Sequence, residues 1–120
     1  MESPFANCPY SLVYQAYKNL YNIPCDCYMD YRGNYEKVNK NSSGIEYGQT
    51  IFYQDNSVPP SIIIYGDYPM YDQVDTLIHE LAHVAVGCEV TSHGKEWKAA
   101  YRSITKEYHR LVDEKNKNIK

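Results

Sequence analysis

Two histidines and a glutamate between residues 76 and 83 form the part of the sequence best suited to chemistry. The segment reads Thr-Leu-Ile-His-Glu-Leu-Ala-His and contains the pattern H-E-x-x-H. On a helix, His79 and His83 leave the same face about one turn apart, so their imidazoles can share a metal ion. Glu80 is turned away from that line and can reach a water on the metal. The pattern predicts a zinc site with open positions and Glu80 as general base.

The alternative interpretation is a histidine pair that only caps or covers a core helix. Apolar residues surround the pair, because Leu81 and Ala82 separate the two histidines and Val84 follows them. Burying two histidines without partners would be costly. The sequence therefore favours a metal site over a structural pair.

A two-histidine site requires a third protein ligand, and His93 is the best candidate. Gly87 is expected to end the helix, so the chain can reverse and present His93 at the start of the next helix. The alternative role for His93 is a helix-entry residue in a turn. His109 lies about four turns further along and would point far from the ion. The other candidates are the carboxylates of Glu89 and Glu96.

Hydrophobic periodicity predicts the elements that position these residues. Apolar residues at helical spacing predict an N-terminal helix over Tyr10–Tyr21, and residues 32–43 are polar and typical of a loop. Strands are predicted at three places, which are Cys25–Tyr31, Ile45–Gln54 and Ser61–Tyr65.

Two helices follow the predicted strands. Asp72 is expected to cap the first, with Asp75 in the capping-box position and Gly87 at its end. The second is expected to run from near Ser92 to about Glu114. Its apolar stripe consists of Trp97, Ala100, Tyr101, Ile104, Tyr108, Leu111 and Val112. The prediction is one small α+β domain over residues 1–114, zincin-like in its order of elements, with residues 115–120 frayed.

Two motifs together resemble the SprT-like metallopeptidases, the family that contains bacterial SprT and eukaryotic Spartan. H-E-L-A-H at residues 79–83 is followed by H-G-K-E-W-K at residues 93–98. The resemblance is specific over residues 72–104. It implies a zinc-dependent endopeptidase with His79, His83 and His93 as ligands and Glu80 as general base. It also implies that Trp97 packs behind the site, as the apolar stripe independently predicts.

This chain departs from the family's pattern in two ways. The gap between His83 and His93 is shorter than in bacterial SprT and Spartan, which requires a tighter loop. The zinc ribbon or DNA-binding extension of the longer members does not follow the second motif, so the chain resembles the bare catalytic core.

Metzincins fit less well, because Gly87 and His93 are misplaced for their longer motif and every methionine lies upstream.

Composition limits the partners. The chain has 120 residues, a net charge of −3, no apolar run long enough to span a membrane and no visible signal peptide, so an intracellular location is expected. Residues 95–120 nevertheless carry 8 basic and 4 acidic side chains. The basic residues Lys98, Arg102, Lys106 and Arg110 share one helix face. A solvated face is the favoured interpretation, and a weak contact with DNA phosphates is the minority one.

The cysteines give little support for a second metal site. Cys25 and Cys27 are two residues apart, which is the wrong spacing for a zinc knuckle. A four-cysteine site with Cys8 and Cys88 is disfavoured, and reduced structural thiols are expected.

The expected activity is hydrolysis of protein or peptide substrates, with DNA-associated proteins among them. The alternatives are a noncatalytic, zinc-stabilised module that binds peptides or proteins, and a peptidase acting on cell-wall peptides. Candidate oxyanion donors are Tyr65, Tyr68 and Tyr101. The strand at Ser61–Tyr65, if it lies at the sheet edge, could hold substrate as an added strand; an ordinary core strand is an equal alternative.

Overall fold

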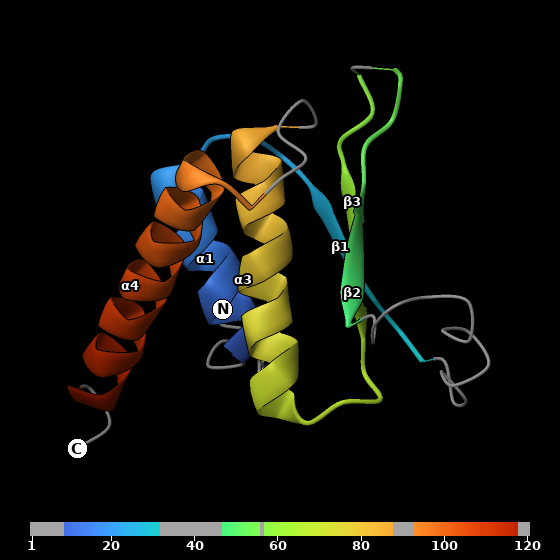
Figure 1. The fold of residues 1–120 in the computed structure, drawn as a ribbon. Coiled ribbons are helices and arrows are strands. Elements are labelled where there is room, and N and C mark those ends of the chain that lie inside the picture. Colours follow the sequence, from blue (N-terminus) through green and yellow to red (C-terminus); the bar gives the residue numbers. More distant parts are fainter. Residues whose placement is uncertain (1–8, 32–46, 56, 88–92, 118–120) are drawn as a thin grey trace.

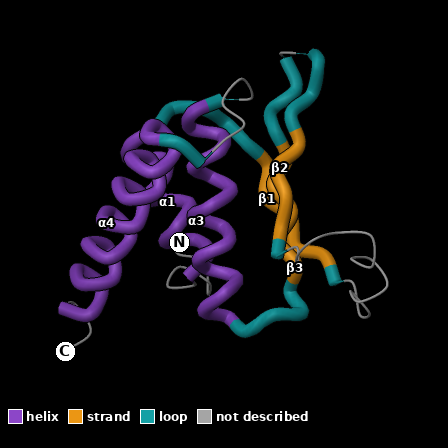
Figure 2. The backbone as a smooth tube through the Cα atoms, in the orientation of Figure 1, coloured by secondary structure: helices purple, strands orange, loops and turns teal. Residues whose placement is uncertain are grey.

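The computed structural model describes residues 9–31, 47–55, 57–87 and 93–117. The elements run in the order α1 (Pro9–Leu20), β1 (Asp26–Asp30), β2 (Gly48–Ile51), β3 (Ser61–Tyr65), α3 (Met70–Val86) and α4 (Lys95–Lys117). The helices lie on one side of the sheet, and α3 stands between the sheet and the other two (Figure 1, Figure 2). This arrangement confirms the predicted small α+β domain. No helix in the described ranges is long and apolar enough to cross a membrane.

The sheet has the strand order β1-β3-β2, which decides between the two interpretations of Ser61–Tyr65. β3 is central, parallel to β1 and antiparallel to β2, so it is an ordinary core strand and not the sheet edge. Its buried residues explain the position, since Ile62 is 0% exposed and Ile64 is 3% exposed. A substrate strand therefore cannot be added to β3. In the part of the chain that the structure describes, β2 packs against α3 and pairs with a strand on one side only.

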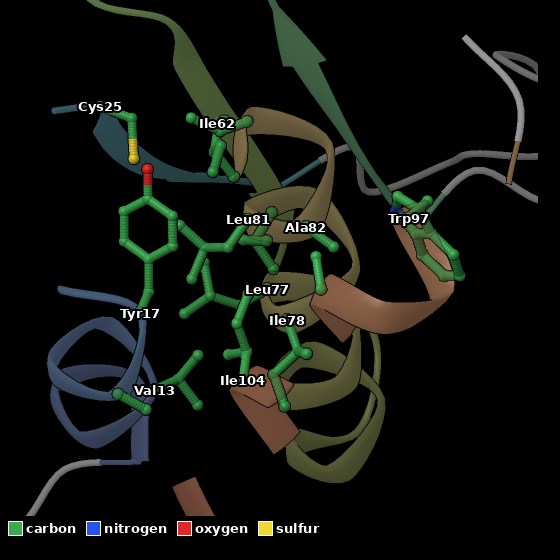
Figure 3. Packing of buried hydrophobic residues seen from close by; sticks show 14 residues of the cluster. Val13, Tyr17, Cys25, Ile62, Leu77, Ile78, Leu81, Ala82, Trp97 and Ile104 are labelled. Atoms are coloured by element: carbon green, nitrogen blue, oxygen red, sulfur yellow. The ribbon is translucent and has the colours of Figure 1, made fainter. Parts of the chain in front are cut away.

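The core fills the space between the sheet and the three helices. In Figure 3, Val13 and Tyr17 of α1 face Leu77 and Leu81 of α3, and Ile62 of β3 lies above them. On α4 the buried residues are Trp97, Ala100 and Ile104, at helical spacing. Burial of one face of each helix thus fixes α3 against both neighbours.

The helix boundaries differ from the predicted ones. Pro69, with ψ at 152°, is extended, and α3 begins directly after it, so Asp72 lies inside the first turn and does not cap the helix. Asp75 likewise forms no capping box, because it accepts a hydrogen bond from Tyr101. Gly87 does end the helix, with a φ of 91° that favours glycine.

The C-terminal helix is longer than predicted. It continues to Lys117, three residues beyond the expected end at Glu114. The polar sequence after Val112 carries no apolar signal, but Lys115 and Lys117 in the last turn are favourable at the negative end of a helix. The predicted start near Ser92 falls outside the described residues, as do Cys8, Cys88 and the whole of the predicted 32–43 loop.

Glu107 of α4 forms an ion pair with Arg110 of the same helix and a hydrogen bond with Asn19 of α1. Arg110 donates to both oxygens of Glu107 at 2.8 Å, and Asn19 of α1 donates to the Oε2 atom at 2.9 Å. The hydrogen bonds from Arg110, and then from Asn19, lower the pKa of Glu107 to about 2. Glu107 thus tethers the end of α1 to the middle of α4.

This carboxylate should make folding stability depend on pH below about 4.5. Because its pKa is lower in the folded state than in the unfolded chain, its contribution is present above pH 4.5 and is lost as the pH falls towards 2. Urea unfolding of wild type and Glu107→Gln at pH 6 and pH 3 measures this. We expect a smaller fall in midpoint for the variant, and a smaller difference in 1 M salt because the pair is at the surface. Equal falls would contradict the tether.

Candidate metal centre

Three histidines converge where the end of α3 meets the start of α4. His79 and His83 come from adjacent turns of α3, and His93 directly precedes α4. The Nε2 atoms of His79 and His83 are 3.3 Å apart, and those of His83 and His93 are 3.1 Å apart. The possible ligand atoms of the three residues all lie within 4.8 Å of one another. The structure brings together the three histidines predicted from the sequence, in a group that can hold a metal ion.

Other residues considered as ligands lie elsewhere. Glu96 is exposed in the first turn of α4, and His109 is exposed further along that helix beside Tyr108. Neither belongs to the histidine group. Glu89 lies outside the described residues.

His79 and His83 are held in the form that a metal requires. Burial, followed by the neighbouring His83 and His93, lowers the pKa of His79 to about 4. Burial and then His93 also lower the pKa of His83. These two imidazoles are therefore neutral near pH 7, and a neutral imidazole has a nitrogen lone pair available for a metal.

Trp97 packs against all three histidines, as predicted. Its ring centroid lies 4.8 Å from that of His79, 5.7 Å from that of His83 and 4.4 Å from that of His93. The indole is 9% exposed, and its Nε1–H group donates to the backbone oxygen of His79 at 3.3 Å. Trp97 thus joins α4 to the histidine-bearing turn of α3 and restricts the orientations of the imidazoles.

The carboxylate of Glu80 lies between the histidines and the sheet. Its Oε2 atom is 3.9 Å from the Nε2 atom of His79. Its Oε1 atom accepts a hydrogen bond of 2.5 Å from the Oγ1 atom of Thr50 on β2. The sequence did not reveal Thr50, since nothing in a single chain indicates which residue of a neighbouring strand will face a helix. Glu80 therefore has one oxygen on the sheet side and one towards the metal group.

Of the tyrosines predicted as oxyanion donors, Tyr101 lies beside the site. It stacks on Trp97 with ring centroids 5.2 Å apart, and its hydroxyl donates to Asp75, one turn before His79. Burial, and then the bond to Asp75, raise the pKa of Tyr101 to about 12. Tyr65 is 3% exposed, and Tyr68 packs against Tyr47. With its proton held by Asp75, Tyr101 would have to change partner to serve as a donor.

A cavity of about 510 Å³ begins beside the Asp75–Tyr101 pair and extends between α3 and α4. It is mainly nonpolar. Its walls include Tyr71, Val74 and Ile78 from α3 and Tyr108 from α4. None of the three clustered histidines lines this cavity, but Ile78, which directly precedes His79, does, so the cavity can accommodate a nonpolar side chain of a bound peptide.

Comparison with known proteins adds one positive result. A family model described as the SprT-like family matches residues 27–118, which is more than half of the chain and includes all three histidines and Glu80. A search of curated proteins and a search of solved structures found no match.

Proposed function

Because this chain belongs to the SprT-like family, we propose that it is a zinc-dependent endopeptidase in which Glu80 is the general base. The observation that carries the proposal is the convergence of His79, His83 and His93 beside a buried carboxylate. A structural zinc site is closed by four protein ligands, whereas the described residues supply three histidines here. Three ligands with a nearby carboxylate are typical of catalytic zinc.

The spacing of the histidines fits zinc. Zinc binds histidine nitrogen at about 2.0–2.1 Å with tetrahedral geometry, which places two ligand nitrogens about 3.3 Å apart. The two measured Nε2–Nε2 separations are 3.3 and 3.1 Å. All three candidate ligands are imidazole nitrogens, a set that suits zinc better than magnesium or calcium. When bound, zinc would polarise the scissile carbonyl and make an attacking water more acidic.

The protein groups would then manage protons and orientation. Glu80 takes the proton of the attacking water at Oε2, the oxygen that faces His79, and passes it to the nitrogen of the leaving amine. Trp97 keeps His79 in place through the bond to its backbone oxygen. The two oxygens of Glu80 therefore have different roles: Oε2 takes the proton, and Oε1 accepts the hydrogen bond from Thr50.

The substrate we propose is an extended segment of an unfolded protein. In the described ranges, β2 pairs with β3 on one side, and no strand pairs with its other side. A peptide added there would run beside Thr50 and Glu80 and would gain backbone hydrogen bonds with little dependence on sequence. The cavity between α3 and α4 would take a nonpolar side chain near the scissile bond.

The basic face of α4 supports DNA binding only weakly. Arg110 pairs with Glu107 and Glu114, so part of the positive charge is neutralised within the helix. Lys98, Arg102 and Lys106 are exposed. We therefore treat DNA as a variable in the cleavage assay. If DNA phosphates contact this face, any effect of DNA should weaken as the salt concentration rises.

The test is cleavage of an unfolded protein, read by mass spectrometry of the fragments. We expect zinc-loaded protein to cut, metal-stripped protein to be inactive, and added zinc to restore activity. Fragment ends should show a nonpolar residue beside the cut bond. Adding DNA at low and high salt tests stimulation in the same experiment. If the zinc-loaded protein leaves varied unfolded substrates intact yet binds them, the noncatalytic binding module becomes the better proposal.

A further inference from the structure

The carboxylate of Glu80 is held by a strand that the histidine motif does not include. Glu80 is 7% exposed, and Thr50 donates to its Oε1 atom at 2.5 Å. The same hydroxyl lies 3.4 Å from the backbone oxygen of Glu80. The opposite oxygen, Oε2, lies on the side of His79 at 3.9 Å from Nε2. The hydrogen bond from Thr50 thus determines which oxygen of Glu80 faces the metal group.

β2 lies close to α3, which brings Thr50 within hydrogen-bonding distance of Glu80. Gly48 and Thr50 lie two residues apart on one face of β2, and Thr76 and Glu80 lie one turn apart on α3. A Cβ atom on Gly48 would lie 2.8 Å from the Cγ2 atom of Thr76 and 2.7 Å from the backbone oxygen of Ile63. Such distances are too short for any other residue without movement of the strand. Glycine at position 48 therefore lets the strand lie near enough for Thr50 to reach Glu80.

The sheet in turn fixes the position of Thr50 along the helix. Thr50 pairs with Ile62, which is 0% exposed, and Gly48 pairs with Ile64. Because a one-residue slip would turn these side chains away from the helices, the pairing register is strongly determined. The donor is thus attached to a rigid element. It is not carried on a loop.

We propose that Thr50 is a positioning residue for Glu80, fixing the carboxylate so that Oε2 faces the reacting water; the inference rests on the proposed function. A glutamate side chain has several rotatable bonds, and a general base must stay within hydrogen-bond reach of the proton that it removes. Displacement of a catalytic group by about 1 Å can cost about 10²-fold in rate. Thr50 acts through Glu80 and is assigned no contact with substrate.

Three substitutions test the hydroxyl separately from the packing. Thr50→Val keeps the shape and removes the hydroxyl, whereas Thr50→Ser keeps the hydroxyl. Thr76→Val is the matched control, because the Thr76 hydroxyl donates to the backbone oxygen of Asp72 within α3. We expect Thr50→Val to lower kcat about 10–100-fold with KM within about 3-fold. Thr50→Ser should recover most of kcat, and Thr76→Val should stay within about 2-fold of wild type.

A second measurement needs no activity. In metal-free protein labelled with ¹³C at glutamate carboxylates, the Cδ resonance of Glu80 can be assigned by its loss in Glu80→Gln. We expect this resonance to move in Thr50→Val, to remain near the wild-type position in Thr50→Ser, and to be unchanged in Thr76→Val. Thermal midpoints and zinc content of the three variants are measured alongside. They identify any variant whose lost activity comes from lost folding or lost zinc, because removing the donor to a buried carboxylate can also lower stability.

The two measurements separate the possible failures. An unshifted Glu80 resonance in Thr50→Val, or an active wild type with unchanged kcat in that variant, overturns the inference. So does a Thr50→Ser variant as impaired as Thr50→Val, which would indicate a packing role. If wild-type protein is inactive while the resonance shifts as expected, the contact between Thr50 and Glu80 stands and the proposed endopeptidase activity fails.

Discussion

Replacing Glu80 by glutamine should lower kcat/KM for peptide cleavage by about 10²–10⁴-fold, the usual contribution of a general acid–base group. Glutamine has nearly the same shape and can still accept the hydrogen bond from Thr50 through its amide oxygen. It cannot take a proton from water. Zinc content should remain at the wild-type level, since Glu80 is assigned no place among the ligands. The measurements are rates of fragment formation and metal analysis of the same samples.

Glu96→Gln is the matched control for this loss. Glu96 is an exposed carboxylate in the first turn of α4, next to Trp97, and lies outside the histidine group. The same chemical change there should leave zinc content and kcat/KM within about 2-fold of wild type. A Glu80→Gln protein that cleaves at the wild-type rate would remove Glu80 from the mechanism. Loss of zinc in Glu80→Gln would instead assign it a role in metal binding.

The sequence was most informative where one local rule decides the outcome. The helical spacing of His79 and His83 places them on one face whatever surrounds them, and Gly87 ends the helix through its own backbone freedom. A helix end at Gly87 allows the chain to reverse, which made His93 the best candidate for the third ligand, and the family resemblance of residues 93–98 implied the same role. The two histidines of the helix were thus predictable from local spacing, whereas His93 also needed the second motif.

Features that depend on pairing between distant segments were not predictable. The predicted strand Ile45–Gln54 extends past the end of β2 at Ile51, where the pairing with β3 also ends, and residues 45–46 lie outside the described residues. The central position of β3 depends on a crossover connection that no local pattern reveals. Thr50 owes its contact with Glu80 to both facts. The supporting residue of the candidate site was missed for the same reason as the strand order.

Removing the third histidine, His93, should strongly lower the affinity for zinc. His93 lies outside the helical pair, and its Nε2 atom is 3.1 Å from that of His83. In His93→Ala we expect zinc affinity to fall by more than the 10–100-fold that loss of a supporting outer group costs, because a ligand itself is lost. Competition with a chromophoric chelator measures the affinity. Cleavage at limiting zinc should fall in parallel.

His109→Ala is the matched control for His93→Ala. His109 is a histidine of α4 that lies outside the group and is exposed, so both variants remove one exposed imidazole, but only His93 is close to the other histidines. Added zinc should raise the thermal midpoint of wild type and His109→Ala, since a ligand that binds only the folded state stabilises it. The rise should be much smaller in His93→Ala at the same zinc concentration. Equal rises in all three proteins would show that His93 does not bind the metal, and its position beside His83 would then reflect packing against Trp97.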